Sequence, residues 1–296
     1  MRKYERKGKQ IKPTAILTAD WHLRDTQPVC RTDNFWESQW KKVQYVLNLQ
    51  NEHKCPIIHA GDFFHTWKTS PYLLSKTMEH MDSKYPFLTV YGNHDLPQHN
   101  LELAHKSGLH TLCMAGKLIT LPGGHWGDTP SEVPVHQGVA VCHIFTYADK
   151  APWPGCTAPS AKQILKKYPQ YKLIVTGDNH TPFVVQYKDR LLVNPGSITR
   201  QTTDQQEHRP KVFLWYEETN AVVVMHLPIE KGVVTREHMA EKEARDERME
   251  AFISKLKEEW DTTISFEQNM KEFLATNKLR KSVVALIHKA MDMEDC

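Results

Sequence analysis

Five short apolar runs occur in the first two-thirds of this chain, and each leads directly into a short polar segment. Because the runs are short, rich in β-branched residues and bounded by turn residues, we expect buried strands. Helix-forming stretches, Asn34–His53 and Pro71–Lys84, separate the first three runs, which predicts a βαβαβ opening with a partly parallel sheet. The five runs are Ala15–Ala19, Pro56–Ala60, Phe87–Tyr91, Gly138–Cys142 and Leu173–Thr176.

Two further pairs of apolar runs follow, spaced as β-hairpins. Phe183–Tyr187 precedes Leu191–Val193, and Val212–Tyr216 precedes Val222–Leu227. Short separations between apolar runs favour antiparallel pairing. We therefore expect both hairpins to build a second sheet packed on the first. The predicted fold class is α/β, with two packed sheets flanked by helices and a helical extension at the C-terminus.

The chain changes character at about residue 235. Residues 236–260 are dense in charged helix formers and contain neither Gly nor Pro, which predicts a solvated helix. A second stretch, Leu279–Met291, places its apolar residues on one helical face. That face must pack on the body of the chain or on a partner, and both interpretations stay open. Its residues are Leu279, Val283, Val284, Ile287 and Met291.

The composition matches that of a soluble globular protein, with 40% hydrophobic and 25% charged residues. No stretch approaches the roughly 18 consecutive apolar residues that a membrane-spanning helix needs. The six cysteines have no paired spacing, so a disulfide scaffold is not expected. These observations favour a cytoplasmic protein without a membrane partner.

The net charge of +3 is unevenly distributed along the chain. Residues 1–12 carry six Lys and Arg against one Glu, whereas residues 231–296 carry 12 Lys and Arg against 14 Asp and Glu. The residues between them are balanced. A globally basic nucleic-acid binder is therefore excluded, and any DNA binding must use local patches. We expect a basic arm over 1–13, a catalytic domain over 14–230 and a helical extension over 231–296.

Polar residues of a particular kind follow each of the five predicted strands. Because the carboxyl ends of strands in an open α/β sheet gather the ligand, these segments are expected to converge. Carboxylate, amide and imidazole groups in this mixture suit divalent ions such as Mn, Fe or Zn. One such segment alone is common, but five in order predict a metal site. The segments are Asp20-Trp21-His22, Gly61-Asp62, Gly92-Asn93-His94-Asp95, Cys142-His143 and Gly177-Asp178-Asn179-His180.

This order of motifs resembles the calcineurin-like metallophosphoesterases, whose fold is an α/β-β/α sandwich of two sheets. The resemblance covers Ala15 to about Ser197. Longer segments around the motifs are similar to the SbcD-type DNA repair exonucleases, a group that includes the eukaryotic double-strand-break repair nuclease. These segments are DWHL at Asp20–Leu23, HAGDFFHTWKTSP at His59–Pro71, YPFLTVYGNHD at Tyr85–Asp95 and LLVNPGSITRQ at Leu191–Gln201.

The resemblance implies a site with two divalent metal ions and a bridging carboxylate from Asp62. It implies that His94, oriented by Asp95, stabilises or protonates the leaving oxygen, and that His65 belongs to the nuclease site. Mn²⁺ is the favoured ion, with Zn²⁺, Fe²⁺ and Mg²⁺ as alternatives. The implied ligands are Asp20, His22, Asp62 and His180 for one ion and Asp62, Asn93, His143 and Asp178 for the other.

One position departs from the family pattern. The last motif is usually Gly-His-x-His, and here Asp178 stands where the first histidine is expected. A carboxylate can replace imidazole as a ligand and adds negative charge, which favours harder ions such as Mn²⁺ or Mg²⁺. We expect Asp178 to be a ligand.

The resulting functional prediction is a dinuclear phosphodiesterase, an SbcD-like DNA nuclease in which a metal-bridged hydroxide attacks phosphorus in line. A phosphoesterase acting on a small nucleotide, a cyclic nucleotide or a phosphoprotein is the alternative, and a non-catalytic scaffold is a third possibility. The resemblance further implies DNA as substrate and an SMC-like, SbcC-type ATPase as partner of the C-terminal helices. It also implies a homodimer, for which the apolar face of Asn34–Gln50 is a candidate, although that face could equally pack on the sheet.

Residues near the motifs receive structural interpretations. His59 lies within a predicted strand, and Trp21 is expected to pack beneath the metals. Cys142 is expected to be a buried thiol. Arg200 and Lys68 are either phosphate contacts or, more simply, solvated surface residues.

Overall fold

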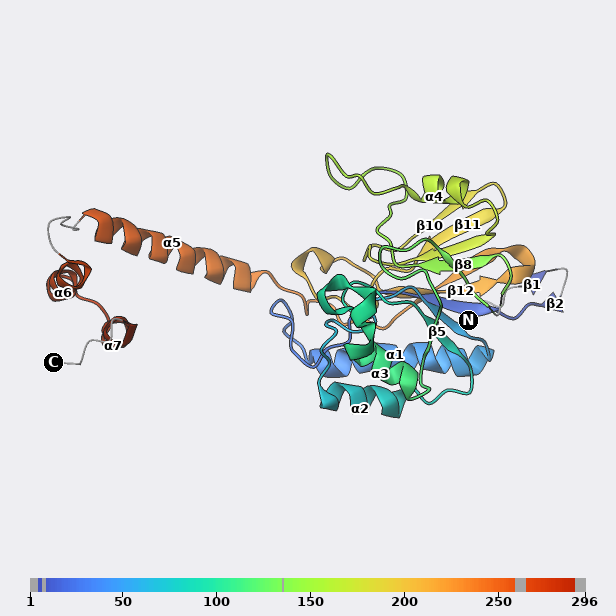
Figure 1. Ribbon diagram of the computed structural model, residues 1–296, viewed down its shortest axis with the longest axis horizontal. Coiled ribbons are helices and arrows are strands. Elements are labelled where there is room, and N and C mark those ends of the chain that lie inside the picture. The colour runs from blue at the N-terminus through green and yellow to red at the C-terminus, as the bar shows by residue number, and fades with distance from the viewer. Residues whose placement is uncertain (1–4, 7–8, 135, 259–264, 291–296) are drawn as a thin grey trace. The chain divides into compact units, whose positions relative to one another are not determined.

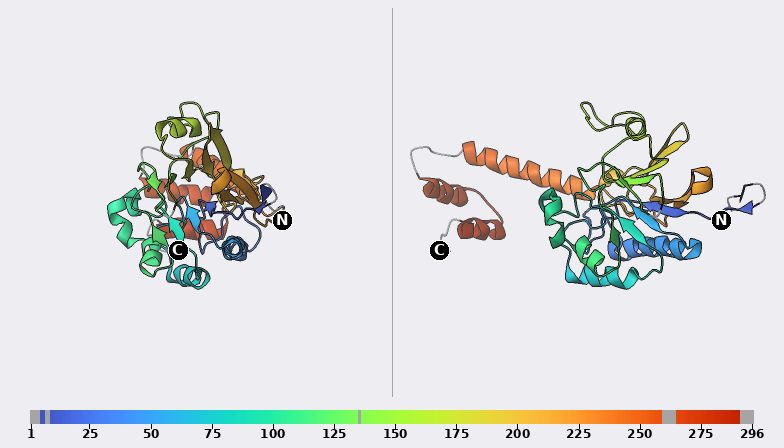
Figure 2. Two further views of the ribbon diagram at one scale, coloured as in Figure 1. Left: turned by 90° about the vertical axis from the view of Figure 1, so that its right-hand side faces the viewer. Right: turned by 45° about the vertical axis from the view of Figure 1, so that its right-hand side comes forward.

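The computed structural model describes residues 5–6, 9–134, 136–258 and 265–290 (Figure 1). The chain divides into two compact units, Met1–Thr235 and Arg236–Cys296. In the first unit two β-sheets lie face to face, with helices on the outer side of each, as Figure 2 also shows. The predicted α/β fold with two packed sheets is confirmed. The division into 1–13, 14–230 and 231–296 stays a prediction.

The first sheet has six strands in the order β13-β12-β3-β4-β5-β6. The four strands β3 to β6 are parallel, and β12 pairs antiparallel with both β3 and β13. The bounds are β3 (Ala15–Thr18), β4 (Ile57–His59), β5 (Phe87–Thr89), β6 (Ile119–Thr120), β12 (Lys211–Tyr216) and β13 (Ala221–His226).

The second sheet has five strands in the order β10-β11-β9-β8-β7. Its three central strands are parallel, and both edge strands are antiparallel to their neighbours. The bounds are β7 (Ser131–Glu132), β8 (Val139–Cys142), β9 (Leu173–Thr176), β10 (Phe183–Tyr187) and β11 (Arg190–Asn194). A separate antiparallel pair joins β1 (Glu5–Arg6) to β2 (Lys9–Gln10).

The hairpin of β12 and β13 corrects one expectation, because it extends the first sheet rather than the second. Strand β12 is buried on both faces: Val212, Leu214 and Tyr216 join the helix-covered core, whereas Phe213 and Trp215 join the core between the sheets. A strand buried on both faces needs a central place in a sheet with helices behind it. The edge of β3 offers that place, and β12 pairs there.

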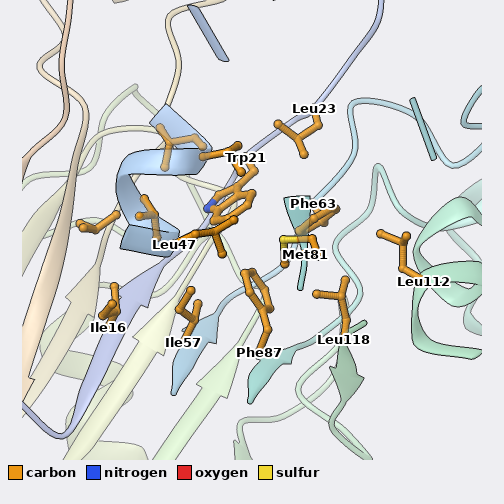
Figure 3. Close-up of a cluster of buried hydrophobic side chains, with 14 of the residues drawn as sticks. Ile16, Trp21, Leu23, Leu47, Ile57, Phe63, Met81, Phe87, Leu112 and Leu118 are labelled. Carbon is orange, nitrogen blue, oxygen red and sulfur yellow. The ribbon is translucent and has the colours of Figure 1, made fainter. Parts of the chain in front are cut away.

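Helices cover the outer face of the first sheet and form the larger core with it (Figure 3). The helix α1 (Phe35–His53) begins where the Asn34 side chain accepts a hydrogen bond from the Glu37 amide, and α2 (Pro71–His80) is capped by Ser70. The apolar face of α1 is buried against the sheet through Trp40, Val43, Val46 and Leu47, which supports the packing interpretation.

Other elements carry no clear sequence signal and were not predicted. The short helices α3 (Gly108–Met114) and α4 (Ala161–Lys167) cover the first and second sheets respectively (Figure 1). Within the described residues, four 3-10 helices lie in the connections: η1 (Pro97–His99), η2 (Leu101–Lys106), η3 (Thr203–Gln205) and η4 (Glu217–Thr219).

The second unit contains α5 (Glu237–Glu258), α6 (Phe266–Thr276) and α7 (Lys281–Ala290). The helical extension predicted from the sequence is therefore present. In the predicted apolar face, Val283 is 41% exposed, and Met291 lies outside the described residues. Over the described part of the chain, every helix is too short or too polar to cross a membrane.

Candidate metal centre

The polar segments that follow β3, β4, β5, β8 and β9 lie at one edge of the two sheets. Backbone hydrogen bonds continue the pairing of β3 and β4 beyond the strands: the Asp20 amide donates to the Gly61 carbonyl, and the His22 amide donates to the Asp62 carbonyl, both at 3.0 Å. The Asp178 amide donates to Oδ1 of Asp20, also at 3.0 Å. The predicted convergence of these motifs is thus present in the fold.

Four of the predicted ligands have a left-handed backbone. The φ angles are 49° at Asp20, 45° at His22, 56° at Asp62 and 72° at Asp178. Such conformations cost side-chain-bearing residues on the order of 1 kcal/mol or more each, and they persist where the surrounding structure enforces them. Four strained residues in one cluster are typical of a functional site.

Asp20, His22 and His180 form the first ligand group, with ligand atoms within 4.8 Å of one another. The Nε2 atoms of His22 and His180 face each other at 3.0 Å, and Nε2 of His22 lies 3.4 Å from Oδ2 of Asp62. Burial lowers the pKa of both histidines, so their rings are neutral and present lone pairs. Oδ2 of Asp20 is buried without a hydrogen-bond partner. Converging lone pairs and an unpartnered carboxylate oxygen fit a divalent cation.

His143 is the centre of the second group. Its Nδ1 donates to the Ala60 carbonyl at 2.7 Å, so Nε2 faces Oδ1 of Asn93 at 3.0 Å and Oδ2 of Asp62 at 3.5 Å. Oδ1 of Asp178 lies 3.9 Å from the same Nε2. Burial lowers the pKa of His143, but the neighbouring carboxylates, Asp62 first, outweigh burial and raise this pKa to about 10. The oxygens around Nε2 therefore favour a positive charge at this place, and a divalent metal ion bound to Nε2 would supply it instead of a ring proton.

Asp62 is the group that contacts both sets of ligands. Its Oδ2 lies near Nε2 of His22 and Nε2 of His143, and its Oδ1 accepts a hydrogen bond from the His94 amide at 3.0 Å. Burial raises the pKa of Asp62, but the imidazoles of His143 and His22 outweigh burial and hold it well below its usual range. This is the position expected of a bridging carboxylate.

His65 and His94 lie beside the first ligand group. The ring centroids of His94 and His65 are 4.7 and 5.9 Å from that of His22. Nδ1 of His94 donates to the His65 carbonyl at 2.7 Å, which leaves Nε2 as the ring's other polar atom. A cavity of about 190 Å³ adjoins these rings. Its lining residues are His22, His65, His94, His180, Ser197, Thr199, Gln201, Thr202 and Gln205.

Asp95 does not orient His94 as expected, because its carboxylate is fully used elsewhere. It accepts backbone hydrogen bonds from Phe63, Phe64 and Gly92 at 3.2, 3.1 and 3.0 Å. Burial, with a smaller contribution from Asp62, raises the pKa of Asp95 to about 7. Asp95 therefore joins the segments after β4 and β5, and the His65 carbonyl holds the ring of His94.

Two glutamines that the sequence does not single out support the first ligand group. Gln201 donates from Nε2 to the His22 carbonyl at 2.9 Å and to Oγ1 of Thr199 at 2.8 Å. Gln39 of α1 is fully buried and bonds both the amide and the carbonyl of Arg24. Together they hold the turn that contains the strained His22.

Three other residues have clear structural roles, and a fourth, Lys68, lies on the surface. Trp21 is fully buried and stacks on Phe63, and His59 pairs with Thr89 at 2.9 Å, both as expected. Arg200 corrects the sequence-based alternatives, because it is 5% exposed and donates to the carbonyls of Gln206 and Glu230. It is therefore neither a solvated residue nor a phosphate contact. Lys68 is exposed.

The fold and this site define a metal-dependent phosphoester hydrolase. The chain belongs to the calcineurin-like phosphoesterase superfamily, because the sequence profile of that superfamily's domain matches residues 16–219. Members of this superfamily use a dinuclear site for divalent metal ions. Among the described residues, the groups whose ligand atoms lie close enough to hold an ion are Asp20, His22 and His180; Asp20, Asp62 and His143; and His22, His65 and His94. A search of curated proteins finds no match.

The solved structures that are similar to this chain include a phosphodiesterase, a metallophosphoesterase and a nuclease. A novel archaeal phosphodiesterase is 15% identical with a TM-score of 0.43, over 72% of this chain and 99% of that one. A metallophosphoesterase from Sphaerobacter thermophilus is 12% identical with a TM-score of 0.40, over 73% and 89%. The nuclease MPE of Pseudomonas putida is 16% identical with a TM-score of 0.35, over 76% and 99%.

Proposed function

We propose that this chain is a phosphodiesterase that cleaves nucleic acid, an SbcD-like DNA nuclease. The observation that carries the proposal is the pair His65 and His94, which lies beside His22 at the cavity. The other residues that line this cavity are His180 and uncharged Ser, Thr and Gln side chains. Among the described residues that line it there is no Lys or Arg. A phosphomonoester dianion needs more cationic partners than a diester monoanion does, so the lining favours a diester.

Two divalent ions would polarise the phosphoryl oxygens and lower the pKa of water. Asp20, His22, Asp62 and His180 would hold one ion, and Asp62, Asn93, His143 and Asp178 the other. The carboxylate of Asp178 favours a hard ion, Mn²⁺ first. The chain itself contributes His94, whose Nδ1–H is held by the His65 carbonyl, so that the Nε2–H of its imidazolium form would be the group that gives a proton to the leaving oxygen and leaves a neutral ring.

A phosphoesterase acting on a small nucleotide, a cyclic nucleotide or a phosphoprotein is the second candidate. It would share the metal chemistry, and the even balance of 20 basic and 20 acidic residues over 13–230 favours it. A non-catalytic scaffold would be expected to lack ligands or His94, and these residues are all present in this chain.

A substrate panel with Mn²⁺ tests the proposal. Linear double-stranded DNA, single-stranded DNA, bis-p-nitrophenyl phosphate and p-nitrophenyl phosphate would be incubated with the full chain. We expect turnover of DNA and of the diester, loss of both with EDTA, and a loss of about a hundredfold or more in His94→Ala. His105→Ala, an exposed histidine on η2, is the matched control. Turnover of the monoester alone would contradict the proposal.

The proposal extends to partners and location. DNA is the substrate, an SMC-like ATPase of the SbcC type binds the helices of 231–296, and the protein is a cytoplasmic homodimer. A groove of about 580 Å³ on α1 and α2, lined by Trp36, Trp40 and Tyr45, supports the dimer.

Gln201 offers a test of how the first ligand group is held. Gln201→Met should weaken metal binding at that group by about ten- to a hundredfold, because Nε2 no longer holds the His22 carbonyl. Calorimetric titration with Mn²⁺ should then resolve one weakened and one unchanged site. Gln206→Met, at an exposed position in the same loop, should leave both sites unchanged. Two unchanged sites in Gln201→Met would show that the hydrogen bond does not position His22.

A further inference from the structure

Two aromatic pairs lie on loops near the second ligand group. His99 meets Trp126 edge to face with ring centroids 5.2 Å apart, and Phe145 meets Trp153 at the same distance. Both indoles are largely exposed, Trp126 at 40% and Trp153 at 51%. An exposed aromatic ring gives up the hydrophobic stabilisation that burial would provide, which is typical of a side chain that contacts a ligand or a partner.

Trp126 lies on backbone that is hydrogen-bonded to two of the segments that carry the metal centre. Its amide donates to the Tyr91 carbonyl at 2.9 Å, two residues before Asn93. The His143 amide donates to the Gly124 carbonyl at 2.8 Å, two residues before Trp126. The indole therefore starts from backbone that lies between the segments carrying Asn93 and His143.

Trp153 belongs to a loop whose base is hydrogen-bonded to a segment of the same centre. The loop leaves the site two residues after His143, at Phe145. Thr146 donates from Oγ1 to the Pro159 carbonyl at 2.7 Å, which closes the loop, and Asn179 donates from Nδ2 to the Thr146 carbonyl at 2.8 Å. Asn179 follows Asp178 directly. In Figure 1 this loop is the yellow-green segment that projects before α4.

We propose that Trp126 and Trp153 stack the bases of a single-stranded nucleic acid next to the second ligand group. This inference rests on the proposed function and names its substrate as single-stranded. Every base has a π-face, so aromatic stacking binds a strand without reading its sequence. The neighbours of the indoles on these loops include exposed Asp128, Asp149 and Lys150, so the surface is not the continuous apolar patch that a protein partner would cover.

Kinetics on two substrates tests the stacking separately from the chemistry. In Trp126→Ala and Trp153→Ala we expect KM for a short oligothymidylate to rise by about 5- to 100-fold, with turnover of bis-p-nitrophenyl phosphate unchanged. The phenylalanine variants, which keep a ring, should retain most of the affinity. Tyr72→Ala is the control, since Tyr72 is 63% exposed on α2 and far along the chain from these loops.

A measurement of oligothymidylate binding in the absence of turnover tests base stacking by the indoles independently of the proposed phosphodiesterase activity. Fluorescence anisotropy of a labelled oligothymidylate, with Ca²⁺ in place of Mn²⁺, should show the same order of affinities. Unchanged binding and KM in both alanine variants would overturn the stacking proposal and assign the indoles to a protein contact, while leaving the phosphodiesterase intact. Absence of turnover by the wild-type chain on either substrate would overturn the proposed function, and the anisotropy series would still decide the stacking. Thermal unfolding of each variant identifies any that fail to fold.

Discussion

Replacing Asp62 by asparagine should lower turnover of bis-p-nitrophenyl phosphate by about a thousandfold or more, since several kcal/mol of charge stabilisation depend on the metals. Asp62 is the carboxylate whose Oδ2 lies 3.4 Å from Nε2 of His22 and 3.5 Å from Nε2 of His143. An amide is neutral, so in Asp62→Asn the atom in the place of Oδ2 would carry no net negative charge to hold cations at both ligand groups. Metal content measured on the variant should fall from two ions per chain to one or none.

Asp82→Asn is the matched control for this substitution. The Asp82 side chain is 88% exposed and its carboxylate is 3.4 Å from Nζ of Lys117, so its loss should leave turnover and metal content unchanged. Thermal unfolding separates a folded, metal-free variant from an unfolded one. A folded Asp62→Asn protein with two ions and full turnover would exclude the bridging role.

The sequence predicts the strands that carry the site because their pattern is local and repeated. Strands β3, β4, β8 and β9 are fully buried, and each is followed by its polar segment within a few residues. Parallel strands end at the same edge, so the chain order alone predicts that the polar segments meet. The position of β12 cannot be predicted from a local pattern, because the sheet that β12 joins depends on its pairing with β3, about 200 residues away in the chain.

Long-range hydrogen bonds account for the parts that could not be predicted. The sequence places Asp95 beside His94, but its carboxylate bonds backbone amides of a different segment, at Phe63 and Phe64. The buried Arg200 likewise donates to the Glu230 carbonyl, 30 residues away. Neighbouring residues in sequence do not reveal such bonds, because any backbone group can accept or donate. Strands β6 and β7 could not be predicted for a different reason: each has two residues, too few to show the alternation of apolar and polar side chains that indicates a strand.

Strain is a property of this centre that no motif reveals. Four ligand-bearing residues have positive φ, and the carboxylates and imidazoles around them are buried. The strained backbone brings carboxylates close to one another at a cost in free energy, and bound cations would offset the repulsion between these carboxylates. The centre therefore depends on close backbone approach between segments, and the motif glycines are where that approach occurs.

Gly92→Ala should destroy the centre although it changes no ligand. A Cβ at position 92 would lie 2.0 Å from Oδ1 and 2.4 Å from the backbone nitrogen of Asp62. Since the second atom is backbone, the segments after β4 and β5 must separate, which moves Asp62 and Asn93. We expect a loss of about 2–3 kcal/mol in the free energy of unfolding. Chemical denaturation and metal titration measure the two effects.

Gly123→Ala separates this steric effect from the general cost of adding a methyl group. A Cβ there would meet only atoms of Ser131, at 3.6 Å, which is ordinary van der Waals contact. Neither Gly92 nor Gly123 has a positive φ, so backbone strain does not enter the comparison. Gly123→Ala should therefore keep its stability, its metal content and its turnover. Equal behaviour of the two variants would mean that the segments after β4 and β5 can separate without loss, and that Asp62 does not need its observed position.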